Sequence, residues 1–302
     1  MTPKHGATLG RMTGPGLALG SMSSSQLGAV LSVPLMVAHG SLGISATRLV
    51  WAAVFSLVLA RPDFRRFSRR QWRAAATLGV VVAFMTLCYF MAVTLIPVGP
   101  AITIDFLGPL SVAVVALRGW PRFVLPVLAA FGVLAMSYSP HGWLFDPLGI
   151  LFALGAGAGW AGYIVLMRHV GRLFSAQDGL CLSFIIASVV AMPVAIALDP
   201  PAHWIALVPE VAGIALLSPL IPFVFEMAAL RRMDMGTFSI LMSLEPAIGT
   251  LLGFVLLGQV LAAQQVLGVL AVMTASIAAV LLSSVKRHEP LADRKPCAAP
   301  GD

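Results

Sequence analysis

The sequence predicts an all-α integral membrane protein with ten transmembrane helices, built as two inverted five-helix repeats. Three observations predict this fold. Of the 302 residues, 59% are hydrophobic and only 10% are charged, whereas soluble domains contain about 25% charged residues. Apolar runs long enough to cross a membrane follow one another along almost the whole chain. The positively charged residues fall in alternate loops between these runs.

Each apolar run is close to the length of about 20 residues that a membrane helix needs. The predicted helices cover residues 15–38, 42–60, 74–95, 98–117, 122–138, 147–167, 178–198, 208–230, 236–257 and 262–284. Serines interrupt the first run, and Lys4 and Arg11 precede it, so a cleaved signal peptide is the alternative there. The apolar stretch continues through Leu27–Val37 and no clear cleavage site follows, which favours a membrane span.

The distribution of charge predicts the topology. Lysine and arginine occur before the first span, in every second loop and after the last span: Lys4, Arg11, Arg61, Arg65, Arg66, Arg69, Arg70, Arg73, Arg118, Arg122, Arg168, Arg172, Arg231, Arg232, Lys286, Arg287, Arg294 and Lys295. The positive-inside rule therefore places both termini in the cytoplasm, for a chain in the inner membrane of a bacterium. This rule and contacts with membrane lipids explain the net charge of +7, so no nucleic-acid partner is expected.

Two parts of the chain repeat at a fixed spacing. Val98-Gly99-Pro100 and Gly108-Pro109-Leu110 match Met235-Gly236-Thr237 and Glu245-Pro246-Ala247, which lie 137 residues later. Similar glycine-led runs begin at Gly132 in the fifth span and at Gly268 in the tenth. An odd number of helices per repeat gives the two copies opposite orientations. The predicted organisation is a cytoplasmic tail at 1–14, repeats at 15–145 and 146–285, and a second cytoplasmic tail at 286–302.

Four ionisable side chains fall inside predicted spans: Arg48, Asp105, Glu226 and Glu245. A charge at membrane depth is costly and is usually retained for function. Asp105 and Glu245 lie near the middle of the fourth and ninth helices, and the repeat equivalent of Glu245 shares a helical face with Asp105. We therefore expect both acids to face a common interior and to bind protons or a substrate ammonium group. A structural ion pair of either acid with Arg48 is the alternative.

For the other two ionisable residues, Glu226 and Arg48, the sequence leaves two interpretations open. Glu226 lies close to the cytoplasmic end of the eighth span, where function and structure are equally plausible. Arg48 is the only cation toward the outer side, so it is either a counter-charge to a buried acid or a binding group for a substrate carboxylate. Prolines mark the same regions: Pro219 and Pro222 are expected to break the eighth span and to free backbone carbonyl groups.

The glycine-rich stretch Gly155–Gly159 is expected to allow close helix packing. A nucleotide-binding loop is excluded because no strand precedes the stretch and no lysine follows it. Trp160 and Tyr163 come directly afterwards and are candidates for lining a cavity, with ordinary packing as the alternative. The chain contains neither metal-ligand spacing nor a hydrolase motif, so we expect no metal, no cofactor and no enzymatic activity.

The run Leu241–Ala247, together with ten spans in two inverted repeats, resembles the drug/metabolite transporter superfamily of the EamA type. Four segments resemble its threonine/homoserine exporter branch: Ala46–Leu49, Asp105–Leu110, Leu154–Trp160 and Glu226–Leu230. The resemblance covers residues 15–284. It implies export of a small zwitterionic amino acid by proton antiport with alternating access.

Three residues depart from the pattern of that family. Gln259 follows Leu257-Gly258, where the family usually has a glutamate, and it cannot titrate. Asp105 stands where the exporter branch more often has glutamate, and Gln26, a further candidate for lining the cavity, stands where many relatives have tryptophan. These changes are expected to affect a proton site or the size of the substrate. Another metabolite or a drug as substrate, a passive channel and a non-transporting scaffold remain alternatives, and the oligomeric state is not predicted.

Overall fold

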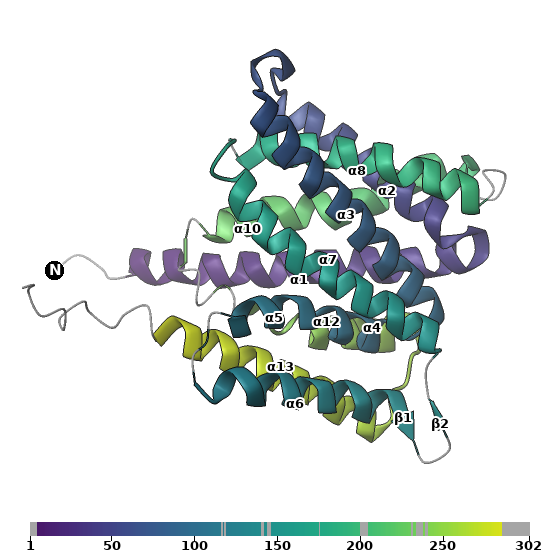
Figure 1. Cartoon of the computed structure of the whole chain (residues 1–302), viewed down its shortest axis with the longest axis vertical. Helices are drawn as coiled ribbons and strands as arrows, with labels where there is room; N and C mark the ends of the chain where they lie inside the picture. Colours follow the sequence, from purple (N-terminus) through teal and green to yellow (C-terminus); the bar gives the residue numbers. More distant parts are fainter. Residues whose placement is uncertain are drawn as a thin grey trace, which may run out of the picture.

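The computed structural model describes residues 5–115, 117, 119–139, 142–143, 146–174, 176–199, 205–230, 232–233, 238 and 241–285. Long helices lie side by side in one bundle (Figure 1). Predictions that concern Lys4, Arg118, Arg231, Gly236 and the tail 286–302 fall outside the described residues.

The helices of the two halves have the following bounds. The first half contains α1 (His5–His39), α2 (Ser41–Ala60), η1 (Phe64–Arg66), α3 (Arg69–Leu95), α4 (Val98–Asp105), α5 (Leu107–Val115) and α6 (Pro121–Ser137). A short antiparallel hairpin follows, with β1 (Tyr138–Ser139) paired to β2 (Gly142–Trp143). The second half contains α7 (Pro147–Val170), α8 (Ala176–Leu198), η3 (Ile205–Leu207), α9 (Val208–Ala215), η4 (Leu216–Leu220), α10 (Ile221–Leu230), α12 (Glu245–Leu257) and α13 (Ala263–Val285).

The lengths and composition of these helices confirm the predicted membrane fold. Within the described ranges, 8 helical segments are long and apolar enough to cross a membrane. The apolar helices α6 and α12 are shorter, with 17 and 13 residues, and complete the ten predicted spans. The first helix begins at His5, before the predicted start of its span, but its apolar segment begins at Gly14.

The helices pack in a pattern that stays the same when the two halves are exchanged. The second helices of the halves, α2 and α8, pack together, and so do the fifth, α6 and α13. The first helix of each half, α1 or α7, packs against the third span of the other half: α7 contacts α3, and α1 contacts α10. It also packs against the fourth span of the other half: α7 contacts α4 and α5, and α1 contacts α12. With an odd number of spans in each half, this exchange relates helices of opposite orientation, so the packing pattern is the one that an inverted repeat requires.

Two glycines face each other where α6 crosses α13. A methyl group placed on Gly132 would lie 2.8 Å from the carbonyl oxygen of Gly268, and one on Gly268 would lie 2.4 Å from the carbonyl oxygen of Gly132. Both separations are too short for a real Cβ atom, so only glycine permits this approach. These glycines begin the matched runs of the two repeats, so equivalent residues meet where the halves touch.

The fourth and ninth spans are broken at equivalent places, whereas we expected each to be one continuous helix. Helix α4 ends at Asp105 and α5 begins at Leu107. In the ninth span, residues 243–244 form a turn and α12 begins at Glu245. The expectation that Asp105 and Glu245 lie near mid-helix is therefore wrong: one acid ends a half-helix and the other begins one.

Proline explains both breaks. Pro109 and Pro246 lie 137 residues apart, and neither has an N–H group to donate to the carbonyl group four residues earlier. The carbonyl groups of Asp105 and Met242, which are also equivalent in the repeat, therefore lose their helical donors. A proline at the equivalent position in each half, Pro109 or Pro246, therefore interrupts the helix at the equivalent turn.

The eighth span is also interrupted, as its prolines predicted. Ser218 lies between α9 and α10 and has non-helical dihedral angles, with φ −156° and ψ 114°. Three carbonyl groups near this break accept hydrogen bonds from side chains of α1 and α2: Leu217 from Ser24 at 2.7 Å, Ser218 from Arg48 at 3.0 Å, and Pro222 from Ser21 at 3.2 Å. The serines that interrupt the first apolar run thus face the break in the eighth span.

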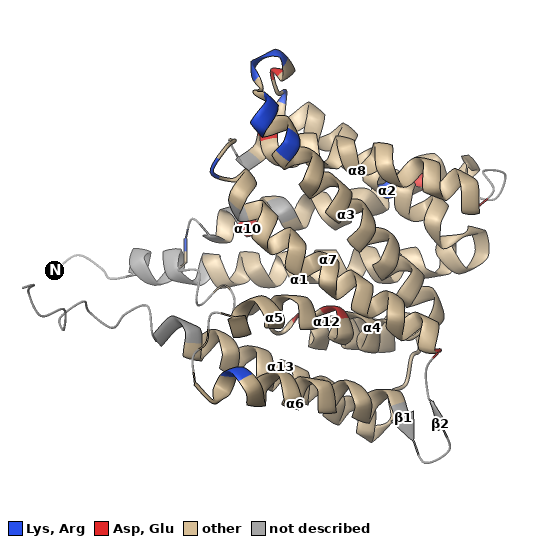
Figure 2. Cartoon of the chain, viewed as in Figure 1, with Lys and Arg blue, Asp and Glu red and all other residues tan. Residues whose placement is uncertain are grey.

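The charged residues are unevenly distributed over the bundle. Figure 2 shows most of the arginines among the described residues around η1, at the top of the view, and toward its left edge. The β1–β2 hairpin lies toward the opposite side. This arrangement agrees with the alternation of charge along the chain.

Candidate functional site

Asp105 and Glu245 face the same part of the bundle interior. Each side chain is only 5% exposed, and the helices that contain them, α4 and α12, pack together. Their carboxyl groups interact electrostatically. Asp105 Oδ1 and Glu245 Oε2 have no hydrogen-bond partner among the described residues. The structure therefore brings together the two acids that we expected to share an interior.

Gln26 connects α1 to this pair. Its Nε2 atom donates a hydrogen bond to Glu245 Oε1 at 3.0 Å, and the residue is 2% exposed. One turn beyond Glu245, Gly249 leaves room for the amide, because a methyl group there would lie 2.9 Å from Gln26 Oε1. Gln26 therefore orients one carboxylate oxygen of Glu245, while the other oxygen has no partner within the described part of the chain.

Arg48 is buried in α2 and forms no ion pair with any residue that the structure describes. Its Nη2 atom donates to the carbonyl oxygen of Ser218 at 3.0 Å, and its guanidinium carbon lies 4.1 Å from the centre of the Phe90 ring, a cation–π contact. Nε and Nη1 have no hydrogen-bond partner within the described ranges. No described carboxylate oxygen lies within 4.0 Å of the guanidinium nitrogens. The structural ion pair of Arg48 with Asp105 or Glu245, which was the alternative interpretation, is therefore not formed.

Tyr89 is a site residue that the sequence analysis missed. It lies on α3 next to Phe90, with the two ring centres 5.1 Å apart at 78°. Its hydroxyl group is buried, has no hydrogen-bond partner in the described part of the chain, and interacts electrostatically with Asp105, Glu245 and Arg48. One tyrosine among many apolar residues of a span gives no periodic signal, so only the tertiary structure reveals its position.

These five residues, Gln26, Arg48, Tyr89, Asp105 and Glu245, form what we call the central cluster. Each has at least one buried polar atom without a partner among the described residues. In folded proteins most buried polar groups are hydrogen-bonded, so several unpaired groups in one place indicate a site for a polar ligand. The cluster can accept hydrogen bonds through its carboxyl groups and donate them through its guanidinium group.

Glu226 lies outside the central cluster, on α10. Its Oε1 atom accepts a hydrogen bond from Ser21 Oγ at 3.0 Å. It also interacts electrostatically with Glu245. Glu226 therefore extends the acidic groups from the cluster along the contact between α1 and α10.

Helix α7 supports the cluster from behind. A methyl group on Gly157 would lie 2.9 Å from the carbonyl oxygen of Asp105, so the glycine-rich stretch serves close packing, as predicted. Trp160 lies edge-on to Phe106, the residue after Asp105, with ring centres 5.5 Å apart. Tyr163 instead packs against a second apolar core formed by α2, α3 and α8. Of the two aromatic candidates, Trp160 contacts a neighbour of the cluster, whereas Tyr163 interacts electrostatically with Glu226.

Gln259 holds the far end of α4. Its Oε1 atom accepts a hydrogen bond from the backbone N–H of Val98, the first residue of that helix, at 3.0 Å. A methyl group on Gly253 would lie 2.9 Å from the same oxygen, so the glycine leaves room for the amide to turn back over α12. Gln259 therefore links the end of the ninth span to the start of the fourth.

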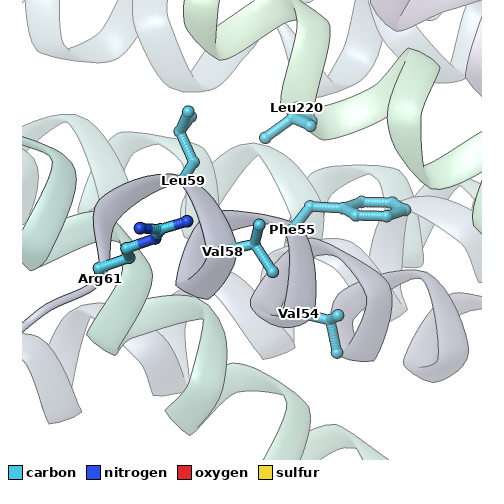
Figure 3. A pocket seen from close by; sticks show the side chains of 6 residues that line it. All are labelled: Val54, Phe55, Val58, Leu59, Arg61 and Leu220. Carbon is cyan, nitrogen blue, oxygen red and sulfur yellow. The ribbon is translucent and has the colours of Figure 1, made fainter.

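A surface groove lies apart from the central cluster. Its lining residues are Val54, Phe55, Val58, Leu59, Arg61 and Leu220 (Figure 3). Val58 and Leu59 are 65% and 52% exposed, as expected for apolar side chains that face lipid. No group of three or more potential metal ligands occurs in the part of the chain that the structure describes.

Ten apolar helices in two inverted repeats, with charged groups buried where broken helices meet, define a multi-pass membrane transporter. Residues 147–282, which form most of the second repeat, match the model of the EamA-like transporter family. The chain belongs to this family, since it is also similar over most of its length to curated relatives.

Those relatives carry one name. The threonine/homoserine exporter RhtA of Salmonella typhimurium (strain LT2) is 31% identical over 285 residues, which cover 89% of this chain and 91% of the relative. The protein of the same name from Escherichia coli (strain K12) is 31% identical over 280 residues, 88% of this chain and 90% of the relative. A solved structure titled "Crystal structure of protein" has a TM-score of 0.58 at 17% identity and covers 91% of this chain and 99% of its own, which supports the fold.

Proposed function

We propose that the protein exports a small zwitterionic amino acid, of the threonine and homoserine type, in exchange for protons. The observation that supports this proposal is the central cluster, in which Tyr89 interacts with a buried guanidinium group and with two buried carboxyl groups. None of these three charged groups forms an ion pair within the described residues. The similarity to proteins named threonine/homoserine exporters supports the same substrate class.

The charges of an amino acid complement those of the cluster. Arg48 binds the α-carboxylate through the guanidinium nitrogens that lack a partner, since guanidinium and carboxylate groups match in geometry and charge. Asp105 and Glu245 bind the α-ammonium group. The hydrogen bond from Gln26 keeps Glu245 in place for this contact.

Competition at the acids couples the substrate to protons. A carboxyl group away from water is stable either as a neutral acid or as a carboxylate beside a cation. When the ammonium group leaves, a proton takes its place, and a proton must leave before the next ammonium group binds. This exchange requires no further charged group, and Glu226 provides a third acid close to the other two.

The inverted repeats support alternating access, because each half can take the conformation of the other and open the site to the opposite side. In this proposal the chain lies in a bacterial inner membrane with both termini in the cytoplasm, as the charge alternation predicts. The breaks beside Asp105 and Glu245 are where the half-helices move relative to each other.

Uptake of labelled threonine into inside-out membrane vesicles tests the function. Export corresponds to uptake in these vesicles, and we expect accumulation above equilibrium when the vesicle interior is acidic. A protonophore should abolish the accumulation, and vesicles without the protein should show none. Equilibration that ignores the gradient would indicate a passive channel. Accumulation of another metabolite or a drug instead of threonine would indicate a different substrate, and no transport at all would indicate a scaffold.

A further inference from the structure

Two consecutive aromatic residues of helix α3, Tyr89 and Phe90, lie at the central cluster. Phe90 lies under the guanidinium group of Arg48, with 4.1 Å from the guanidinium carbon to the ring centre. Tyr89 meets the ring of Phe90 edge-on, with 5.1 Å between the ring centres. Phe90 therefore contacts both the ring of Tyr89 and the guanidinium group of Arg48, the group that we propose binds the substrate carboxylate.

The hydroxyl group of Tyr89 differs chemically from the rest of the cluster. It is buried and has no partner among the described residues, yet a hydroxyl group can donate one hydrogen bond and accept two. Its helix, α3, packs against α2 and α4, which contain Arg48 and Asp105, and the hydroxyl group interacts electrostatically with Asp105, Glu245 and Arg48. When the two acids are ionised and bind the ammonium group, Tyr89 is the one residue of the five whose unpaired atom can both donate and accept, since the unpaired atom of Gln26 is a carbonyl oxygen.

We propose that the hydroxyl group of Tyr89 hydrogen-bonds the side-chain hydroxyl of the transported amino acid and selects hydroxylated amino acids over aliphatic ones of equal size. This inference rests on the proposed function, in which Arg48 and the two acids bind the charged groups of the substrate. A neutral hydroxyl group is the natural partner for the neutral polar group that remains on such a substrate.

The physical basis of the selectivity is the buried hydroxyl itself. A site that is built to hydrogen-bond a substrate hydroxyl rejects an analogue without one, because the buried group of the site is then left unpaired. An apolar pocket would discriminate only weakly between a methyl group and a hydroxyl group. We therefore expect a preference of about 10-fold or more for the hydroxylated member of an isosteric pair.

Threonine and valine form such a pair, and homoserine and norvaline form another. Transport of each labelled amino acid into inside-out vesicles should show the preference in the wild-type protein. Tyr89→Phe removes only the hydroxyl group and keeps the ring on Phe90, so the ratio of threonine to valine transport should fall toward one. Tyr163→Phe makes the same chemical change in a tyrosine that packs against the second apolar core, and it should leave the ratio at the wild-type value.

The outcomes separate this inference from the proposed function. If the wild-type protein transports threonine and valine equally, or if Tyr89→Phe keeps the wild-type ratio, the role of Tyr89 is wrong while amino-acid export stands. An equal fall in the ratio for Tyr163→Phe also overturns it. If the wild-type protein transports no amino acid, the proposed function fails and the inference fails with it. Because the readout is a ratio of two rates measured on the same protein, a smaller amount of folded Tyr89→Phe protein lowers both rates equally and leaves the ratio interpretable.

Discussion

The side chain of Gln259 caps the helix that ends at Asp105: its Oε1 atom accepts a hydrogen bond from the backbone N–H of Val98 at 3.0 Å. Helix α4 consists of 8 residues, so the capped residue and the buried acid are its two ends. The contact requires an acceptor and not a negative charge. This explains how a glutamine can stand where the resemblance to the family led us to expect a glutamate.

Removing this cap should destabilise the protein. The N–H group of Val98 lies in the interior, and leaving a buried donor without a partner costs about 1–3 kcal/mol. Gln259→Leu should therefore lower the melting temperature of the protein in detergent, whereas Gln259→Glu should stay close to the wild type because it keeps an acceptor. Gln177→Leu, at an exposed position on α8, is the control. Equal melting temperatures for Gln259→Leu and the wild type would show that the cap contributes nothing to stability.

The contact between α6 and α13 should not tolerate a side chain. Gly132→Ala or Gly268→Ala would place a methyl group within 3 Å of a backbone oxygen, and such overpacking costs about 1–3 kcal/mol. Both variants should melt at lower temperature. Gly213→Ala is the matched control, since nothing lies within 4 Å of its added methyl group, and it should be neutral or stabilising. Wild-type stability of both crossing variants would contradict the close approach of the two helices.

Arg48 should be needed for transport but not for insertion. Replacing the guanidinium group with an amide in Arg48→Gln removes the charge that we assign to the substrate carboxylate, so threonine transport should fall by about tenfold or more. The amount of protein in the membrane, measured by immunoblot, should not change. Arg172→Gln removes an exposed arginine of the same type and should transport normally. Normal transport by Arg48→Gln would reject a role for this residue in binding.

Asp105 and Glu245 should couple transport to the proton gradient. Asp105→Asn and Glu245→Gln can no longer exchange a proton for an ammonium group, so each should lose accumulation driven by the gradient and its dependence on pH. Exchange of threonine without a gradient can persist where the substrate still binds. Export measured across a range of pH at matched protein levels is the test, with Glu210→Gln, an exposed glutamate on α9, as the control. Wild-type gradient dependence in both variants would mean that neither acid binds the coupled proton.

The topology can be tested independently of transport. A reporter fused after Val285 should be active only if it functions in the cytoplasm, because the positive-inside rule places both termini there. A second fusion in the outer loop at Asp146 should show the opposite behaviour. Activity of a periplasmic reporter at Val285 would mean that the number of spans is odd.

Several features of the site could be read from the sequence. Ionisable residues in apolar spans were recognisable as candidates because few charges occur at membrane depth, and Asp105, Glu245, Glu226 and Arg48 all stood out. The prolines of the eighth span predicted its break. The matched prolines at 109 and 246 were visible too, but their effect on the helices was underestimated, and both acids were therefore placed at mid-helix instead of at helix ends.

Other features depended on contacts between distant parts of the chain. Arg48 could have paired with either acid, and its hydrogen bond to the carbonyl oxygen of Ser218 depends on a helix 170 residues away. Tyr89 could not be distinguished from an ordinary aromatic residue of a span. From the sequence, Gln259 indicated only that a possible proton site was missing. Its role in holding α4 could not be predicted, because its partner, the N–H group of Val98, lies 161 residues earlier in the chain.

The sequence by itself determined that the chain is a membrane protein of successive apolar helices with positive charge in alternate loops, and it predicted two inverted repeats. These are local properties, since every membrane helix must satisfy its own backbone and present apolar side chains over a fixed length. Only the tertiary structure decided which polar groups pair and which remain without a partner. That choice depends on how helices from the two halves approach each other, and the approach is set by glycines, prolines and packing that no single segment of sequence contains.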